Sequence, residues 1–392
     1  RTTLWDYGVD VRPGFLMEYG HNYTGGTRHT DSVVDNEDFR MTVDFHRLSQ
    51  HLFGWQDWRG TTLHFDMMDR NGTLLDEKAQ LGTLYQAQEI FGAGSYFRVP
   101  HLYIEQKLWN DLVDIKLGRL DQSIDFFPFS CDFQNLVFCG SGPGHTAHSV
   151  TLYPLPQTGG SIIINPTWMW SVKFGAYRNN TSKLGRGGHN GTTTMAEIDL
   201  HTRLAGHKDL PGVYSVGGWH NTAQYRLGDS LPGVVTTILA GNPRILAQTS
   251  TWGYYVTLQQ TVTHNTQGGG LTLFANMTHP DHRTNLISMM ATVGGFWKAP
   301  LPDRPNDRID FGLARVSLNH DARALEQLAY ATPGSDVTTF ASQPSYTAEL
   351  DYSIDVWHGA WVMPNFQYIV HPGGSLQNKN ALVFGLQVGL PL

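Results

Sequence analysis

The sequence predicts an all-β protein, a transmembrane antiparallel β-barrel of sixteen strands. Three observations lead to this fold class. Apolar and polar residues alternate with a period of two along many segments, and several of these segments are about nine to fourteen residues long. Long connections also largely alternate with short ones. Together these features predict a closed barrel with one lipid-facing wall and one water-facing wall.

Composition excludes several other classes of protein. Charged residues make up only 16 % of the 392 residues, whereas aromatic residues reach 12 % and glycine occurs 42 times. Disordered chains lack aromatic residues and carry charge, so disorder is excluded. No window approaches the roughly 18 uninterrupted apolar residues of a membrane-spanning helix. The net charge of −7 offers no electrostatic footprint for a nucleic-acid partner.

The alternation is clearest at both ends of the chain. Apolar positions of 6–19 and 38–46 alternate with Asp, Arg, Gly, Thr, His and Glu, and 349–356 repeats the pattern. Successive strand residues point to opposite faces of a sheet. The polar set is too hydrophilic for a packed core, which predicts an inner face in contact with water. Aromatic residues near strand ends, where membrane-interface girdles form, are Tyr7, Tyr19, Trp58, Trp252, Tyr254, Trp357 and Trp361.

The alternation predicts sixteen strands, and we take residues 1–392 as one domain. The predicted strands cover 6–19, 38–48, 58–68, 98–108, 112–120, 161–165, 167–178, 195–203, 213–223, 251–261, 270–277, 286–294, 309–317, 346–357, 361–370 and 380–390. The long connections are 20–37, 69–97, 121–160, 224–250 and 318–345, and the tight turns are 109–111, Pro166 and 358–360. An even strand number with this loop asymmetry is typical of bacterial outer-membrane barrels. Segments 204–212 and 295–308 are long for turns, so eighteen strands are the alternative.

The two cysteines lie close together in a loop rich in Phe, Pro and Gly. The spacing of Cys131 and Cys139 is not a redox or zinc pattern. We predict one disulfide that pins this loop, and hence an oxidising compartment such as the periplasm or the cell surface. Two buried, unpaired thiols are the alternative. The chain starts at Arg1 without a basic-then-apolar leader, which we interpret as a mature form.

Short motifs spread in order over nearly the whole chain resemble those of one family. They are 116–120 (KLGRL), Asp125-Phe126, 131–135 (CDFQN), 138–140 (FCG), 217–219 (GGW), 270–275 (GLTLFA), 304–308 (RPNDR), 364–374 (PNFQYIVHPGG) and 380–386 (NALVFGL). The chain resembles the carbohydrate-selective porins of the OprB family. The C-terminal pair of motifs is the most specific. One departure is that the chain ends on Leu392, whereas outer-membrane barrels usually end on an aromatic residue.

The resemblance implies a function and a location. It implies an outer-membrane barrel whose long extracellular loops fold into the lumen and form a constriction, through which monosaccharides such as glucose diffuse passively. Sugars, outer-membrane lipid and lipopolysaccharide are then the expected partners, and the assembly is a monomer or a homotrimer. The alternatives are the same barrel selective for polyols or for small organic or cyclic acids, and a secreted β-rich carbohydrate-binding protein or glycoside hydrolase.

Candidate solute-binding residues lie around loop 121–160 and its flanking strands. A binding site for a sugar needs hydrogen-bond donors and acceptors for the hydroxyls and an aromatic ring for the C–H face. The candidates are Arg98, Tyr103, Glu105, Lys116, Arg119, Asp125, Asn135 and Trp170. Arg119 shares the parity of apolar Leu117, so either it lies above the lipid or a bulge turns it inward. Trp170 shares the parity of Val172 and Phe174, so a place in the aromatic girdle is its alternative.

The sequence offers little support for an enzyme or a bound cofactor. The 18 histidines are scattered, and no third ligand accompanies the pairs His145/His148 and His279/His282. No phosphate-binding glycine loop and no nucleophile elbow are present. We therefore predict a protein without catalytic residues, cofactor or metal.

Overall fold

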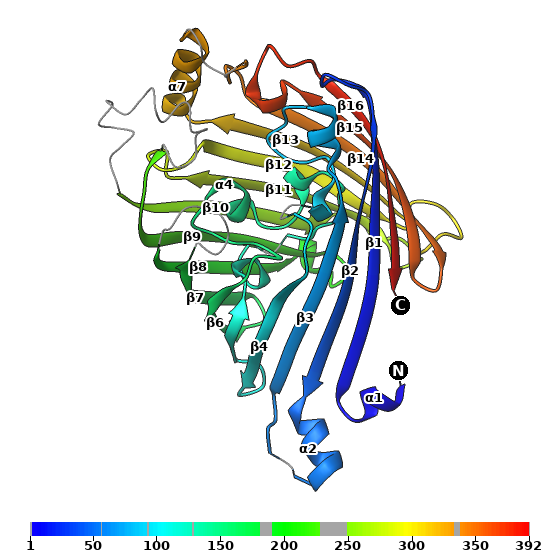
Figure 1. Cartoon of the computed structure of the whole chain (residues 1–392). Coiled ribbons are helices and arrows are strands. Elements are labelled where there is room, and N and C mark those ends of the chain that lie inside the picture. The colour runs from blue at the N-terminus through cyan, green and yellow to red at the C-terminus, as the bar shows by residue number, and fades with distance from the viewer. Residues whose placement is uncertain are drawn as a thin grey trace.

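The computed structural model describes residues 2–55, 57–91, 94–127, 129–180, 190–227, 249–332 and 338–391. Sixteen strands form one closed barrel (Figure 1). They are β1 (Val9–Thr24), β2 (Asp31–Asp44), β3 (Thr61–Gly72), β4 (Arg98–Leu108), β5 (Val113–Leu120), β6 (Gln157–Thr167), β7 (Trp170–Asn180), β8 (Asn190–Arg203), β9 (Pro211–Tyr225), β10 (Thr249–Thr261), β11 (Gly270–Pro280), β12 (Ile287–Lys298), β13 (Arg308–Leu318), β14 (Ser345–Trp357), β15 (Ala360–Val370) and β16 (Ala381–Pro391). The predicted fold class and the strand number of sixteen are confirmed.

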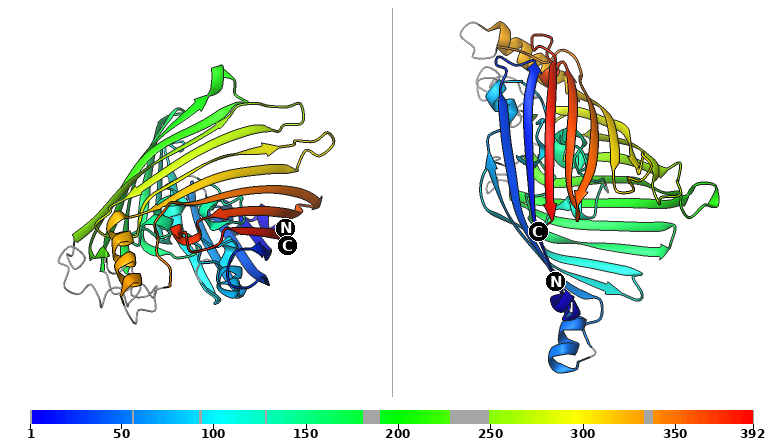
Figure 2. Two further views of the ribbon diagram at one scale, coloured as in Figure 1. Left: turned by 90° about the horizontal axis from the view of Figure 1, so that it is seen from above. Right: turned by 90° about the vertical axis from the view of Figure 1, so that its right-hand side faces the viewer.

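Every strand pairs antiparallel with its neighbours in the chain, and β1 closes the barrel against β16. Phe15 lies opposite Leu390 and Tyr19 opposite Leu386 in this closing pair. Closure leaves no unpaired strand edge, which a sheet in lipid requires because unsatisfied amides there are costly. Both termini lie at the same end of the barrel (Figure 2). We call this the short-turn end, and the opposite end, which carries connections 73–97, 121–156 and 319–344, the long-loop end.

Short helices occupy the connections. They are α1 (Thr2–Asp6), α2 (Phe45–Phe53), α3 (Leu75–Ala79), α4 (Gly142–Thr146) and α7 (His320–Ala331), with 3-10 turns η1 (Glu89–Phe91), η2 (Gln122–Ile124), η3 (Leu136–Phe138), η5 (Leu204–Gly206) and η7 (Pro372–Gly374). Helix α2 projects beyond the short-turn end, far from α7 (Figure 1). Within the described part of the chain, none of the helices combines the length and the apolar character that a membrane crossing demands.

Three local predictions were wrong. The long connection predicted at 20–37 is short, because β1 continues to Thr24 and β2 already begins at Asp31. Residues 45–48 do not continue the second strand but begin α2, because the Asp44 side chain accepts hydrogen bonds from the amides of His46 and Arg47 and so caps a helix. Pro166 is not a turn, since β6 continues to Thr167 and the turn falls at 168–169. The loop predicted at 224–250 lies mostly outside the described residues.

The two faces of the wall differ as the alternation predicts. On β4 and β5, the side chains of Leu102, Ile104 and Leu117 point outward and are 46 %, 47 % and 63 % exposed. Their neighbours Tyr103 and Lys116 point inward and are buried. Exposed tryptophans gather at the short-turn end, as a membrane-interface girdle requires: Trp58, Trp109, Trp168, Trp170, Trp297 and Trp357.

The long connections 73–97 and 121–156 fold into the barrel and fill much of it (Figure 2). Phe126 and Phe127 pack against inward aromatic residues of β7, β9 and β10, while Phe133 and Phe138 pack against β11–β13. Glycine on the wall makes room for this packing: a Cβ at Gly312 would lie 2.8 Å from the Phe138 ring. The interior is therefore a packed core on one side and a water-accessible space on the other.

Candidate functional site

Two cavities lie end to end inside the barrel and meet at the inward loops. The larger, about 620 Å³, opens among residues of β2–β4 and the long loops, and the smaller, about 420 Å³, lies toward the short-turn end near Arg308 and Trp361. Both are lined by Leu16, Glu89 and Cys131. The two cavities therefore share their lining at β1, η1 and the disulfide loop, and we call this zone the constriction.

One side of the larger cavity is lined by charged residues of β2 and β3. The guanidinium of Arg40 lies 2.9 Å from the Asp38 carboxylate, and the Nε of Arg70 donates to Asn36 over 3.2 Å. On β3, Asp66 contacts the His101 ring at 2.6 Å. Alternation along neighbouring strands brings these groups to one inner face. Donors and acceptors therefore alternate along the cavity wall, which is the chemistry that sugar hydroxyls need.

Aromatic and apolar side chains of the inward loops complete the lining of the larger cavity. Tyr85, Phe129 and Tyr153 all border the larger cavity, together with Leu136 and Leu152. Phe129 is held in place because its ring packs against Phe274 at 4.8 Å between centroids. An aromatic face of this kind can stack on the C–H face of a sugar ring while the charged wall binds its hydroxyls.

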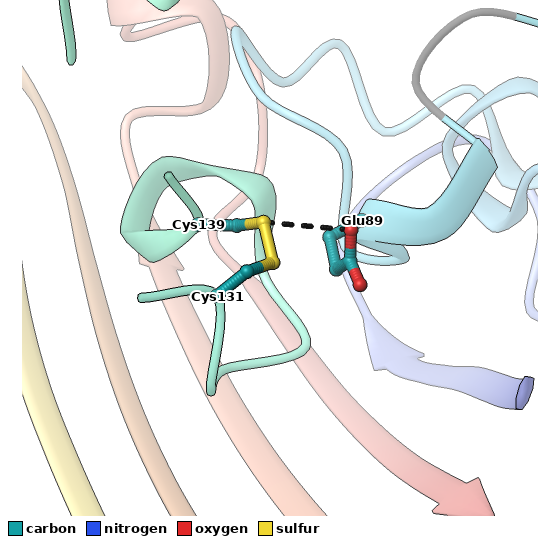
Figure 3. A group of neighbouring side chains, drawn as sticks. All are labelled: Glu89, Cys131 and Cys139. Atoms are coloured by element: carbon teal, nitrogen blue, oxygen red, sulfur yellow. Dashed lines mark hydrogen bonds between the residues drawn. A yellow bond between two sulfur atoms is a disulfide. The ribbon is translucent and has the colours of Figure 1, made fainter. Parts of the chain in front are cut away.

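Glu89 and the disulfide form the constriction. Cys131 and Cys139 are bonded to each other, which confirms the predicted disulfide and excludes unpaired thiols. The Oε2 of Glu89 contacts the Cys139 sulfur at 3.5 Å, so η1 and the disulfide loop face each other (Figure 3). Burial raises the pKa of Glu89 to about 7, against the attraction of Arg70. The charge of the constriction therefore changes near neutral pH.

The same three residues are the one group of potential metal ligands found among the described residues. Cys131 and Cys139 share a disulfide, so neither offers the thiolate that binds a metal. Glu89 alone remains as a hard oxygen donor. The donor set therefore does not fit a metal site, and we assign Glu89 to the solute path.

Loop 121–156 is held on the inner wall first through Glu197 of β8. This carboxylate accepts a hydrogen bond from the Phe127 amide at 2.7 Å and another from the Tyr255 hydroxyl at 2.6 Å. Lys173 of β7 lies 2.6 Å from Glu197 and 2.7 Å from Asp199. All these side chains are buried. A charge buried in this way must keep its partners, so the cluster fixes the loop firmly.

Two further glutamates of the wall bind loop amides. Glu349 of β14 accepts from the amides of Gln134 (2.8 Å) and Asn135 (3.1 Å), and Glu18 of β1 accepts from Ile90 (3.4 Å). Both carboxylates are fully or almost fully buried. Loop backbone that leaves water must find such partners, because an unpaired buried amide is costly. These contacts position η1 and η3, and thereby the constriction.

A third cluster anchors the start of the same loop. Lys116 of β5 forms an ion pair with Asp125, and Asp125 also accepts from the Ser161 hydroxyl at 2.5 Å. Glu105 lies 3.9 Å from Lys116 and contacts the His64 ring at 3.2 Å. The loop enters the barrel at this point, so the cluster sets its direction.

Five of the eight predicted solute-binding residues lie inside the barrel. Tyr103, Glu105 and Lys116 are on the inner wall, and Asp125 and Asn135 belong to the inward loop. None of the five is among the described residues that line either cavity. Four of them join the contacts that hold the loop, and Tyr103 stacks on His64 with centroids 4.6 Å apart. The structure brings them together, but as the support of the path rather than its surface.

Two of the other three predicted residues face outward, and the third lies at the rim of the barrel. Arg119 shares the outer face with Leu117 and donates through Nε to the Val99 carbonyl at 3.0 Å, so no bulge turns it inward. Trp170 is 42 % exposed on the outer wall and belongs to the girdle at the short-turn end. Arg98 starts β4 at the rim of the long-loop end. Arg119 and Trp170 therefore lie outside the lumen.

The residues that do line the larger cavity were only partly visible in the sequence. Asp38, Arg40 and Asp66 alternate with apolar residues in predicted strands. This alternation predicts that their side chains point into the lumen. Arg70 lies beyond the predicted end of its strand at residue 68. Glu89 lies in a long loop, and no periodic pattern marks a loop residue that returns to the lumen.

Comparison with known proteins gives one consistent result. The model of the family described as "Carbohydrate-selective porin, OprB family" matches residues 50–391. "Porin B" of Pseudomonas aeruginosa is 32 % identical over 99 % of this chain and 88 % of its own length, and "Putative porin QuiX" of Acinetobacter baylyi is 25 % identical over 100 % and 90 %. The high-pH structure of Pseudomonas putida OprB superposes with a TM-score of 0.87 at 30 % identity, covering 100 % of this chain and 96 % of that one.

Proposed function

Because this chain belongs to the carbohydrate-selective porin family OprB, we propose that it lets monosaccharides such as glucose diffuse passively through its constricted, water-filled channel. The family consists of channels rather than enzymes, and its barrels lie in the outer membrane of Gram-negative bacteria. What we propose beyond the family is the solute, its selectivity and the residues that contact it.

The observation that carries the proposal is the two-sided lining of the larger cavity. Arg40 and Arg70 of the strand wall supply donors and Asp38 and Asp66 supply acceptors, while tyrosine and phenylalanine rings of the inward loops line the same cavity. A hexose presents hydroxyls around its rim and C–H groups on its faces. Contacts of both kinds slow the sugar at a narrow point without closing the path, because each contact is weak and exchangeable with water.

The balance of charge favours neutral solutes over organic acids. Asp38, Asp66 and Glu89 face Arg40 and Arg70 around the same cavity, so the arginines are matched by carboxylates. Selective passage of an acid needs a net positive constriction, as rings of one charge set ion selectivity. Polyols share the hydroxyl chemistry of sugars but lack the ring face, so the aromatic wall favours hexoses over them.

A liposome-swelling series tests the proposal. Purified protein in liposomes is diluted into isotonic glucose, other hexoses, linear polyols and cyclic or short organic acids, with protein-free liposomes as the control. We expect the fastest swelling with monosaccharides, slower swelling with polyols and the slowest with acids. Equal rates for acids and hexoses of similar size would remove the sugar selectivity. Fastest swelling with acids would instead identify an acid channel in the same barrel.

A further inference from the structure

A row of basic residues crosses the outer wall of the barrel at the long-loop end. Residue Arg119 of β5 lies opposite Leu102 of β4 and Thr158 of β6, and Thr158 lies opposite Arg178 of β7. Because opposite residues of neighbouring strands share a face, and Leu102 is 46 % exposed, the row faces outward. Arg98, at the start of β4, is only 8 % exposed and lies opposite Met68, beside this row.

These arginines surround one recess. It measures about 750 Å³ and is bordered by the side chains of Arg98, Arg119 and Arg178 together with segments 96–99 and 154–158. The recess borders the larger lumen cavity, since Pro154 and Leu155 line both. Its three arginines, however, line neither of the two lumen cavities.

The charge of the recess is entirely positive. None of its described lining residues carries a carboxylate, although the chain as a whole has a net charge of −7. Arg119 and Arg178 are exposed, and neither forms an ion pair with a residue that the structure describes. The Arg98 guanidinium stacks on the Tyr96 ring at 3.5 Å, which orients it at the edge of the recess. Arg119 and Arg178 are therefore brought to one recess whose described lining holds no carboxylate, which is a setting that attracts an anion.

The surroundings of the recess match those of a lipid headgroup. Toward the middle of the barrel the outer face continues with exposed Leu102, Leu117 and Phe174, which face acyl chains. Exposed Tyr96 and Phe97 border the recess itself. Aromatic residues of this kind mark the membrane interface, and in a porin the long-loop end faces the outside of the cell. The arginines therefore lie at the level of the outer-leaflet headgroups.

We propose that this recess binds the phosphate groups of lipid A, the membrane anchor of lipopolysaccharide in the outer leaflet. Arginine suits this ligand, since its planar guanidinium pairs with phosphate through two parallel hydrogen bonds. Two such groups, on β5 and β7 with β6 between them, recognise a doubly phosphorylated headgroup better than a single arginine does. The inference depends on the outer-membrane location of the family and is independent of which solute passes through the lumen.

Native mass spectrometry of the detergent-solubilised, folded protein tests this proposal. Diphosphorylated lipid A is titrated into the wild type and into the double variant Arg119→Gln/Arg178→Gln, with Arg203→Gln as the matched control. Arg203 is also an exposed arginine stacked on an aromatic ring, Trp168 at 4.1 Å, but it lies at the short-turn end. We expect a lipid complex whose affinity falls about fivefold or more in the double variant, because two phosphate contacts are removed, and is unchanged in the control.

A second titration distinguishes phosphate recognition from adsorption to the apolar wall. Lipid A without phosphates is used with the wild-type protein, and we expect its binding to fall to the level of the double variant. Equal binding of phosphorylated and dephosphorylated lipid, or equal binding by wild type and double variant, would overturn the proposal. Heat-modifiable migration on a denaturing gel checks that each variant is folded before it is compared.

Discussion

Charged residues of the inner wall fall into two groups that differ in what covers them. The docking wall, which we define as Glu18, Lys173, Glu197 and Glu349, is buried beneath the inward loops and binds them. The cavity wall, which we define as Asp38, Arg40, Asp66 and Arg70, borders the larger cavity. Both groups occupy inward positions of alternating strands.

The comparison shows that the inward direction of a charged side chain does not distinguish a role in holding the loops from a role in binding solute. On the docking wall, carboxylates replace the water that loop amides lose, so removal of one partner leaves buried groups unsatisfied. On the cavity wall, Arg40 keeps more than half of its side chain exposed and can exchange water for solute. We expect substitutions in the first group to change stability and substitutions in the second to change solute binding.

The largest expected effect is on the docking wall. Replacement Glu197→Ala leaves the Phe127 amide and the Tyr255 hydroxyl without their acceptor and removes one of the two carboxylates beside Lys173. We expect the free energy of unfolding to fall by about 3 kcal/mol, as for other broken buried ion pairs. The free energy of unfolding is measured by urea titration in detergent, with tryptophan fluorescence as the signal.

The matched control for that experiment is Arg12→Ala. Arg12 pairs with Asp10 at 2.6 Å, but its side chain is 65 % exposed at the short-turn end. Exposed ion pairs contribute below about 1 kcal/mol. If Glu197→Ala lowers the free energy of unfolding no more than Arg12→Ala does, the distinction between the two walls is contradicted.

The disulfide should have the second largest effect. In the double variant Cys131→Ser/Cys139→Ser, the loop at the constriction loses its cross-link, and the chain-entropy model gives a cost of roughly 2–3 kcal/mol. We expect the channel to become less uniform, with a broader distribution of single-channel conductances in planar bilayers. A distribution as narrow as that of the wild type would show that the contacts with the inner wall hold the loop without the disulfide.

Replacement Arg40→Gln on the cavity wall should give the reverse result of Glu197→Ala. Its exposed ion pair with Asp38 adds little to stability, so the urea midpoint should hardly change. We expect affinity for glucose, measured from the block of ion current, to fall about fivefold, since one charged hydrogen-bond donor is lost. Unchanged affinity together with reduced stability would place Arg40 in the docking group instead.

The smallest expected effect concerns Glu89. Burial raises its pKa to about 7 against the attraction of Arg70, so the carboxyl is neutral below that pH and negative above it. Cation selectivity, read from the reversal potential in a salt gradient, should therefore rise between pH 6 and pH 8, around the pKa of about 7. In Glu89→Gln this change should vanish, and its persistence would assign it to another group.

Much of the fold could be predicted from the sequence, because alternation is a local pattern. The sequence predicts all sixteen strands in order. It leaves the direction of Arg119 open between the lipid face and an inward bulge, and the structure shows the outward direction. Errors at the strand ends also have local causes. At Asp44, for example, the side chain caps helix α2 and the strand ends there.

The division between docking wall and cavity wall could not be predicted in this way. Lys116 and Asp38 both alternate with apolar residues, yet one is covered by the loop and the other is not. The difference depends on where residues 121–156 settle, and their contacts reach partners more than 200 positions away, such as Glu349 with Gln134. Such pairings have no periodic signal. The candidate residues near this loop therefore hold the loop in place instead of lining the cavity.

Ion current through single channels in planar bilayers tests the central claim most directly. Glucose is titrated against the wild type, Arg40→Gln and Arg12→Gln, which compares a cavity-wall arginine with an exposed arginine at the channel mouth. We predict that glucose reduces the wild-type current in a saturable way, that Arg40→Gln needs more glucose for the same reduction, and that Arg12→Gln behaves like the wild type. A wild-type current that glucose leaves unchanged would contradict the account.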